Sequence, residues 1–124
     1  MTLNNPEEFK ELAIKNSHAL DEMLKYELPK VKEKSISPEL KTFWDNFESK
    51  LNNVKSHKQG NQVLNAYIKL SESRTMMING VDNLEPWFVK ITGVNCETGK
   101  YDQEIINSRK VEPAINIELV DVDN

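Results

Sequence analysis

Apolar and polar residues follow the most regular pattern between Ser37 and Lys58, where apolar residues recur at steps of three and four. This spacing predicts a helix, because helical side chains return to the same side after three or four residues. Ser37 can cap the helix, and Pro38 suits its first position, where a backbone N–H has no partner. The apolar side would be formed by Leu40, Phe43, Trp44, Phe47, Leu51 and Val54.

The apolar side of this helix contains three aromatic residues, Phe43, Trp44 and Phe47, and two interpretations of it are open. In the first, the aromatic residues form the core of the domain, because large apolar side chains are mostly buried. In the second, part of this side is an exposed groove or contact surface, because aromatic residues are also common in protein interfaces.

An earlier helix is predicted to start at Asn5, a capping residue that is followed by Pro6 and two acidic residues. Pro29 is expected to end it one or two residues earlier, because proline clashes with the preceding helical turn. Such a helix is long for a small domain, so it should bend or project. The charged residues 30–35 are expected to form a solvated linker. The apolar positions of this helix are Phe9, Leu12, Ala13, Leu20, Met23, Leu24 and Leu28.

A third helix is predicted after Gly60 and Asn61, which can stop one helix and cap the next. Gly60 could instead lie within one long bent helix, and we favour the break. Three helices in antiparallel succession would bury their apolar sides against each other. The apolar side of the third helix would be marked by Val63, Leu64, Tyr67, Ile68 and Ser71.

After Arg74 the pattern changes to an alternation with a period of two, which predicts strands. A short apolar strand over 75–78 is followed by Asn79–Gly80, a strong signal for a hairpin turn. The returning strand is either 81–84 or a segment that begins after Pro86. Further strands are predicted over 87–94, 101–105 and 115–119, with a turn over 95–100 and Pro113 before the last strand.

The order of these elements predicts an α+β fold. About three N-terminal helices, over residues 5–73, would be followed by a small antiparallel sheet of three to four strands over residues 74–122. The helices would cover one face of the sheet. Because neither half has a generous set of apolar residues and the connection between them is short, we expect residues 1–124 to form a single domain.

Composition restricts the environment of the protein. The 124 residues carry a net charge of −4, with 38% hydrophobic and 29% charged residues, so the core should be thin or completed by a partner subunit. Cys96 is the only cysteine, which excludes an internal disulfide and is typical of a reducing compartment. We find no signal peptide and no apolar run long enough to cross a membrane, and we expect a cytoplasmic protein without a membrane partner.

The sequence contains no pattern of residues that is typical of catalysis, metal binding or cofactor binding. His18 and His57 are isolated, and Cys96 has no second cysteine or neighbouring histidine. The segment Gly93–Lys100 resembles a phosphate-binding loop but has five residues between its glycines, where four are needed. Tyr101 then stands where that motif requires serine or threonine. We therefore predict no catalytic residues, no metal, no cofactor and no enzymatic activity.

The leading hypothesis is a small non-enzymatic module for protein–protein interaction or assembly, which binds a protein partner or itself. A phage or mobile-element accessory protein would suit the composition, because 14 Asn and 14 Lys but only 2 Arg are typical of AT-rich genes. Phe88 falls on the otherwise polar side of its strand, which indicates that both faces are covered there. The candidate partner-binding residues are Phe43, Trp44, Phe47, Trp87, Phe88 and Tyr101.

The alternative hypothesis is a nucleic-acid-binding accessory protein. Aromatic residues on a sheet can stack on bases when basic residues lie nearby. Trp87, Phe88 and Tyr101 would supply the stacking surface. The basic residues close to them in the sequence are Lys90, Lys100, Arg109 and Lys110. The acidic net charge favours the protein partner over this alternative.

Overall fold

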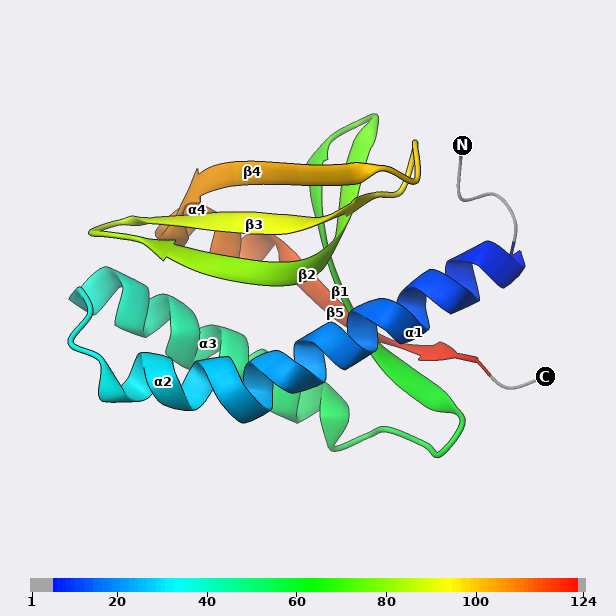
Figure 1. Ribbon diagram of the computed structural model, residues 1–124, viewed down its shortest axis with the longest axis horizontal. Coiled ribbons are helices and arrows are strands. Elements are labelled where there is room, and N and C mark those ends of the chain that lie inside the picture. The colour runs from blue at the N-terminus through cyan, green and yellow to red at the C-terminus, as the bar shows by residue number, and fades with distance from the viewer. Residues whose placement is uncertain (1–5, 123–124) are drawn as a thin grey trace.

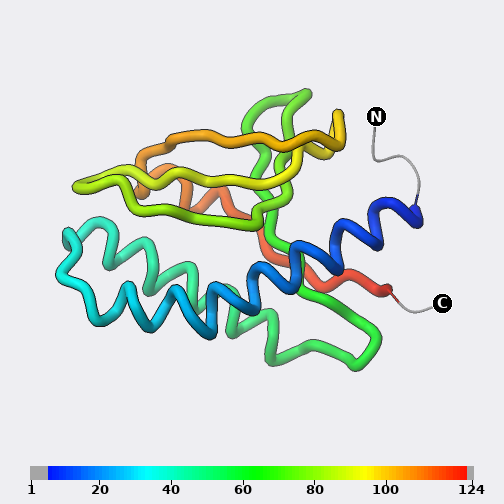
Figure 2. Tube along the Cα trace, viewed as in Figure 1, coloured from blue at the N-terminus to red at the C-terminus, as the bar shows by residue number. Residues whose placement is uncertain are grey.

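The computed structural model describes residues 6–122 and has an α+β fold (Figure 1 and Figure 2). Its elements, in chain order, are α1 (Pro6–Glu22), the π-helix η1 (Met23–Glu27), α2 (Leu28–Glu33), α3 (Pro38–Lys55), β1 (Gln62–Ser71), β2 (Arg74–Leu84), β3 (Phe88–Asn95), β4 (Tyr101–Asn107), α4 (Ser108–Ala114) and β5 (Ile115–Asp121). No helix within these described residues is long and apolar enough to span a membrane.

Elements α1, η1 and α2 follow one another without a break and form one helical rod, which packs against β1 and β2 (Figure 1). The predicted end before Pro29 is therefore wrong, and much of the predicted linker over 30–35 is helical. In η1 the backbone N–H of Leu28 donates to the carbonyl oxygen of Met23, five residues back. This wider turn lets Pro29 occupy the start of α2, where its missing N–H is tolerated. The predicted capping residue Asn5 lies outside the described residues.

The predicted central helix is confirmed as α3. Ser37 has an extended backbone, and its side-chain oxygen accepts a hydrogen bond from the backbone N–H of Leu40 at 3.3 Å. Pro38 occupies the first helical position. The Ser37 hydroxyl also donates to the carbonyl oxygen of Pro86, and the Ser37 N–H donates to Glu85 Oε2 at 3.3 Å. The cap therefore also holds the β2–β3 connection against the start of α3.

The predicted third helix is wrong, because this segment forms β1, an interior strand of the sheet between β2 and β5. Leu64, Ala66 and Ile68 are buried at alternate positions, and Asn65 on the opposite side is buried as well. Burial on both sides hides the alternation that marks a strand in the sequence. Backbone pairing with β2 on one side and β5 on the other overrides the helical spacing of the apolar residues.

The predicted turn at Asn79–Gly80 is also wrong, because both residues lie inside β2. The chain turns earlier, between β1 and β2, and the register of β2 against β3 shifts between Ile78 and Gly80. This shift marks a bulge, and at such sites a strand bends. Figure 1 shows the bend, with the first part of β2 beside β1 and the second part running along β3.

The described residues form a five-stranded antiparallel sheet in the order β4-β3-β2-β1-β5, whereas we predicted three to four strands. The strands predicted over 87–94, 101–105 and 115–119 correspond to β3, β4 and β5. The turn over 95–100 is also confirmed, with Gly99 at φ 73°. Helix α4 between β4 and β5 was missed, because it is short and contains Pro113, so the helices are not all N-terminal.

One cluster of buried side chains joins the helices to one face of the sheet. It extends from the end of the helical rod through α3 and the central strands to α4. Its largest fully buried members are Leu20, Leu40, Phe43, Phe47, Leu51, Ile68, Met76, Ile78, Val89, Ile91 and Val111. The core therefore lies between α3 and the sheet, and the opposite face of β3 and β4 is left without a covering helix (Figure 1).

The close approach of β2 and β3 at Gly93 generates a stability prediction. A Cβ atom on Gly93 would lie 1.7 Å from the carbonyl oxygen of Met77, so alanine requires the two strands to separate. We expect Gly93→Ala to lower the free energy of unfolding by more than about 3 kcal/mol in urea denaturation. Gly60→Ala is the matched control, because nothing lies within 4 Å of its Cβ position. Equal stability of the two variants would contradict the described strand packing.

Candidate functional site

The three aromatic candidates on α3 are core residues. Phe43, Trp44 and Phe47 are only 2%, 4% and 1% exposed, and their rings contact one another with centroids 5.5 to 5.9 Å apart. Trp44 Nε1 donates a hydrogen bond of 2.6 Å to Asn83 Oδ1 in β2. Of the two interpretations that the sequence left open, the structure therefore favours the core, and these side chains are not available on the surface of this fold.

The candidates in the strand half are exposed instead. Trp87, Phe88 and Tyr101 are 51%, 40% and 68% exposed. The expectation that both faces of the sheet are covered at Phe88 is therefore wrong. We define the outer face as the face of β3 and β4 opposite to buried Val89 and Ile91. Paired strand residues share a face, so the outer face consists of Phe88, Lys90, Thr92 and Val94 in β3 and Tyr101, Gln103, Ile105 and Asn107 in β4.

The structure brings Phe88 and Tyr101 onto the same outer face, at its two ends. Phe88 is opposite Asn107 and Tyr101 is opposite Val94, which separates them by roughly 20 Å along the strands. Ile105 lies between them and is 57% exposed. We did not select Ile105 from the sequence, although the alternation of Tyr101, Gln103 and Ile105 was enough to place it beside Tyr101.

Trp87 lies apart from the outer face. It precedes β3 and lines a small hollow of about 270 Å³ together with Glu39, Asn107 and Arg109. The carbonyl oxygen of Trp87 accepts a hydrogen bond of 2.8 Å from the N–H of Ser108. Trp87 therefore lies where the start of α3 meets the start of α4, just before β3 begins at Phe88.

Several basic side chains near these aromatic residues have acidic partners. Lys90 lies 3.9 Å from a carboxylate oxygen of Asp82, and Arg109 lies 3.8 Å from one of Glu39. These ion pairs lower the positive charge that surrounds the exposed rings. Lys100 and Lys110 have no ion pair within the described residues 6–122.

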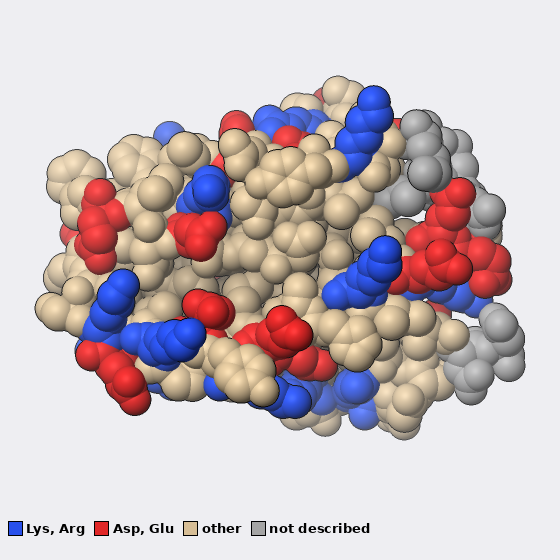
Figure 3. Space-filling model, in the orientation of Figure 1, with Lys and Arg blue, Asp and Glu red and all other residues tan. Residues whose placement is uncertain are grey.

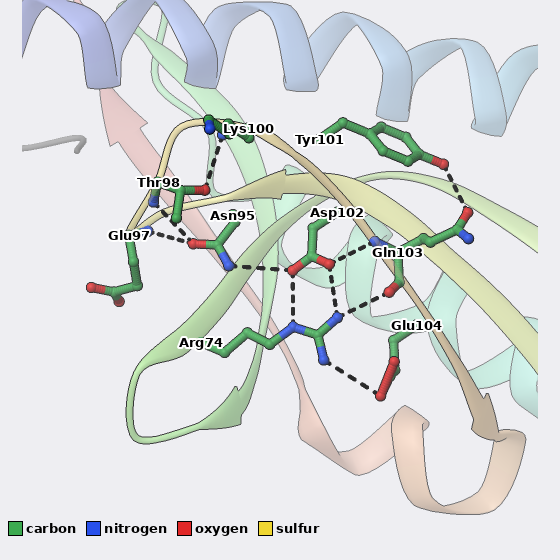
Figure 4. A network of polar contacts seen from close by, with 9 residues as sticks. All are labelled: Arg74, Asn95, Glu97, Thr98, Lys100, Tyr101, Asp102, Gln103 and Glu104. Carbon is green, nitrogen blue, oxygen red and sulfur yellow. Dashed lines mark hydrogen bonds and ion pairs between the residues drawn. The ribbon is translucent and has the colours of Figure 1, made fainter. Parts of the chain in front are cut away.

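A polar network ties β2 to β4 across β3 (Figure 4). Arg74 Nε donates to Asp102 Oδ2 at 3.0 Å, and Arg74 Nη2 donates to Asp102 Oδ1 at 2.7 Å. The same guanidinium donates to the carbonyl oxygen of Gln103 at 2.9 Å and lies 3.5 Å from a carboxylate oxygen of Glu104. A two-point contact of this kind fixes both position and direction, so Arg74 holds the edge strand against the sheet.

The β3–β4 turn is joined to this network through Asn95. Its Nδ2 donates to Asp102 Oδ2 at 3.3 Å, and its Oδ1 accepts from the backbone N–H groups of Glu97 and Thr98 at 2.7 and 3.1 Å. The hydrogen bond from Arg74 holds the pKa of the Asp102 carboxyl below its usual value, with smaller contributions from Gln103 and Asn95. The network is a structural clamp, because its charged groups are already paired.

Cys96 and His57 are two further chemical candidates, and the structure shows the surroundings of each. Burial raises the pKa of the half-buried Cys96 thiol, which lowers its thiolate content, and its N–H donates to the carbonyl oxygen of Thr75 at 2.7 Å. His57 follows the end of α3, and its Nδ1 lies 2.9 Å from the carbonyl oxygen of Asn53 in that helix. Within residues 6–122 no three His, Cys, Asp or Glu side chains are grouped closely enough to hold a metal ion.

Comparison of the chain with models of protein families, with curated proteins and with solved structures found no match. The functional argument therefore rests on the outer face and on the charges around it.

The Arg74–Asp102 pair generates a pH-dependent prediction. The pKa of Asp102 is lowered in the folded state, so its contribution is present above its unfolded pKa of about 3.9 and is lost as pH falls through the lower folded value. We expect Asp102→Asn to lower the free energy of unfolding by about 1 to 2 kcal/mol at neutral pH. The difference from the wild type should shrink below about pH 4.

The matched control for Asp102→Asn is Glu97→Gln, because the Glu97 side chain is exposed on the same turn and has no side-chain partner within the described residues. Urea denaturation at a series of pH values measures both variants. A Glu97→Gln variant that is as unstable as Asp102→Asn would mean that loss of negative charge, and not loss of the clamp, causes the effect.

Proposed function

We propose that this protein is a small non-enzymatic interaction module that binds a protein partner, including a second copy of itself, through the outer face. The observation that carries the proposal is the exposure of Phe88, Ile105 and Tyr101 on one face of two neighbouring strands. Large apolar side chains exposed along one face are typical of binding surfaces.

The sheet also offers a suitable base for such a surface. Phe88, Ile105 and Tyr101 stand on regular strands, and β4 is clamped through Asp102 to Arg74. Little conformational freedom of the backbone is therefore lost when a partner binds, and aromatic anchors lose few rotamers. Because β4 is the last strand of the sheet, a partner can contact both its outer face and its free edge.

The charges around the outer face support a protein partner more than a nucleic acid. Lys90 is close to Asp82 and Arg109 is close to Glu39, so their positive charges are partly cancelled. A surface for phosphate groups usually has unpaired basic residues in a patch. A role as a phage or mobile-element accessory protein stays a prediction from composition.

The first test is the mass of the protein in solution, measured by light scattering during size-exclusion chromatography at about 200 µM. We expect a multiple of 14.3 kDa for the wild type and a monomer for the double variant Tyr101→Ser, Ile105→Thr. Tyr26→Ser is the matched control, because Tyr26 is 62% exposed on η1, away from the outer face. It removes an exposed tyrosine and should keep the wild-type mass.

A monomeric wild type would exclude self-association and require a different partner. A photo-crosslinking residue would then be incorporated at position 105, with position 97 as control, and crosslinked in the organism that encodes the protein. We expect one discrete adduct from position 105 that the Tyr101→Ser change removes. A monomer that forms no such adduct would overturn the proposal.

The nucleic-acid alternative is tested by tryptophan fluorescence. Trp87 is exposed and would report contact, whereas Trp44 is buried and can be measured alone in the Trp87→Phe variant. We expect no salt-sensitive change in Trp87 emission when single-stranded oligonucleotides are added to micromolar protein. A change that disappears at high salt and in the Trp87→Phe variant would instead favour the nucleic-acid function, because phosphate contacts are salt-dependent.

A further inference from the structure

The second part of β2 has a free backbone edge. The pairing of β1 with β2 reaches only to Met77, whereas the pairing of β3 with β2 continues to Leu84. The edge of residues 79–84 that points away from β3 therefore has no strand beside it within the described part of the chain. The bulge at Ile78 to Gly80 causes this separation, because it bends β2 away from β1.

This free edge lies in a groove between the sheet and the helical rod, which we call the edge groove. One hollow of about 550 Å³ lies between β2 and the end of the rod, and a second of about 310 Å³ lies between β2 and the α1–η1 segment. Val81 and Asp82 line both hollows. Taken together, the two hollows are lined by all five residues 79–83. In Figure 3 the surface between the strands and the rod is hollowed.

The backbone in the edge groove is not occupied by the helices. Among the described residues, no hydrogen bond from the rod or from α3 reaches a backbone atom of residues 79–83. The hydrogen bond of Trp44 to this strand goes to the side chain of Asn83, at 2.6 Å, and not to its backbone. A row of backbone N–H and C=O groups that faces a groove can pair with an added strand.

The charge of the edge groove is mainly acidic. Glu22, Glu27 and Asp82 line the hollow of about 310 Å³, which has no basic lining residue. Lys30 lies 3.9 Å from a carboxylate oxygen of Glu27, and Lys90 lies 3.9 Å from one of Asp82, so two of these three charges are partly compensated. The hollow of about 550 Å³ is also lined by Glu33 and by the two lysines Lys30 and Lys34. The helical side of the hollow in Figure 3 carries red acidic side chains. This field favours an occupant with positive charge and disfavours nucleic acid.

We propose that the edge groove binds an extended, lysine- or arginine-rich segment of a partner protein as an added β-strand beside residues 79–84. Main-chain hydrogen bonds to β2 hold the segment, and its basic side chains face Glu22, Glu27 and Asp82. A helix cannot pair with a strand edge, and a nucleic acid would be repelled by the acidic rim. The inference extends the proposed protein-binding function to a second surface, distinct from the outer face.

The experiment uses the full-length ¹⁵N-labelled protein and the peptide Lys-Val-Lys-Val-Lys-Val-Lys with blocked ends. We expect chemical-shift changes in the amides of residues 79–84 and of η1. Hydrogen exchange of amides in residues 79–84 should slow, because they gain partners. The matched peptide Glu-Val-Glu-Val-Glu-Val-Glu should not bind. The absence of these changes at about 2 mM basic peptide, or equal binding of the acidic peptide, would overturn the inference.

Two further comparisons separate strand addition from charge attraction alone. The basic peptide N-methylated at every residue keeps its charge but loses the backbone donors on both of its edges, so it should not bind; equal binding would overturn strand addition. The protein variant Glu22→Lys, Glu27→Lys should bind the basic peptide at least about tenfold more weakly at low salt. Glu97→Lys, an exposed change outside the groove, is the control and should bind as the wild type does.

The outer-face variant Tyr101→Ser, Ile105→Thr distinguishes the two surfaces. We expect it to bind the basic peptide as the wild type does, even where it loses self-association. Loss of peptide binding in this variant, with an unchanged urea denaturation curve, would place the peptide on the outer face and overturn the edge-groove inference. If the protein binds the peptide but forms no complex through the outer face, the proposed role of the outer face is overturned and the edge-groove inference is retained.

Discussion

The burial of the aromatic side of α3 is the interaction on which the rest of the structure depends. Phe43 and Phe47 are at most 2% exposed, and full burial of each such side chain contributes about 1.5 to 3 kcal/mol. Trp44 is buried with its only donor satisfied by Asn83, so the position of the second part of β2 is tied to α3. Ser37 adds a second tie, because it caps α3 and also holds the connection that leads into β3.

These ties decide which surfaces remain open. The apolar residues Val89 and Ile91 face α3, so their neighbours Phe88 and Lys90 must face the other side of the sheet. The bulge of β2 has a similar effect on the backbone, because it separates the second part of β2 from β1. An outer face with apolar side chains and a groove with a free strand edge are thus two results of packing one curved sheet on one aromatic helix.

The strong local patterns of the sequence were sufficient for part of this fold. Ser37 and Pro38 placed the start of α3 correctly, because capping depends on a few adjacent residues. The turn over 95–100 was also predicted, because Gly99 can adopt the positive φ that it has there. The strands with strict alternation were predicted because each has one buried and one solvated side. The sequence alone could not assign β1, because its burial on both sides removes the alternation. It could not assign α4 either, because this helix is short and depends on packing beside α3.

The candidate site shows the same division. The sequence by itself determined that aromatic residues lie on α3 and on the strands, and that the chain lacks the motifs of a known catalytic or metal site. Only the tertiary structure decided that Phe43 is buried while Tyr101 is 68% exposed, because exposure depends on which element covers which face. The free edge of β2 was likewise invisible in the sequence, where Asn79–Gly80 indicated a turn. Pairing of β2 with β3 places these residues at a bulge within a strand, in spite of their local preference for a turn.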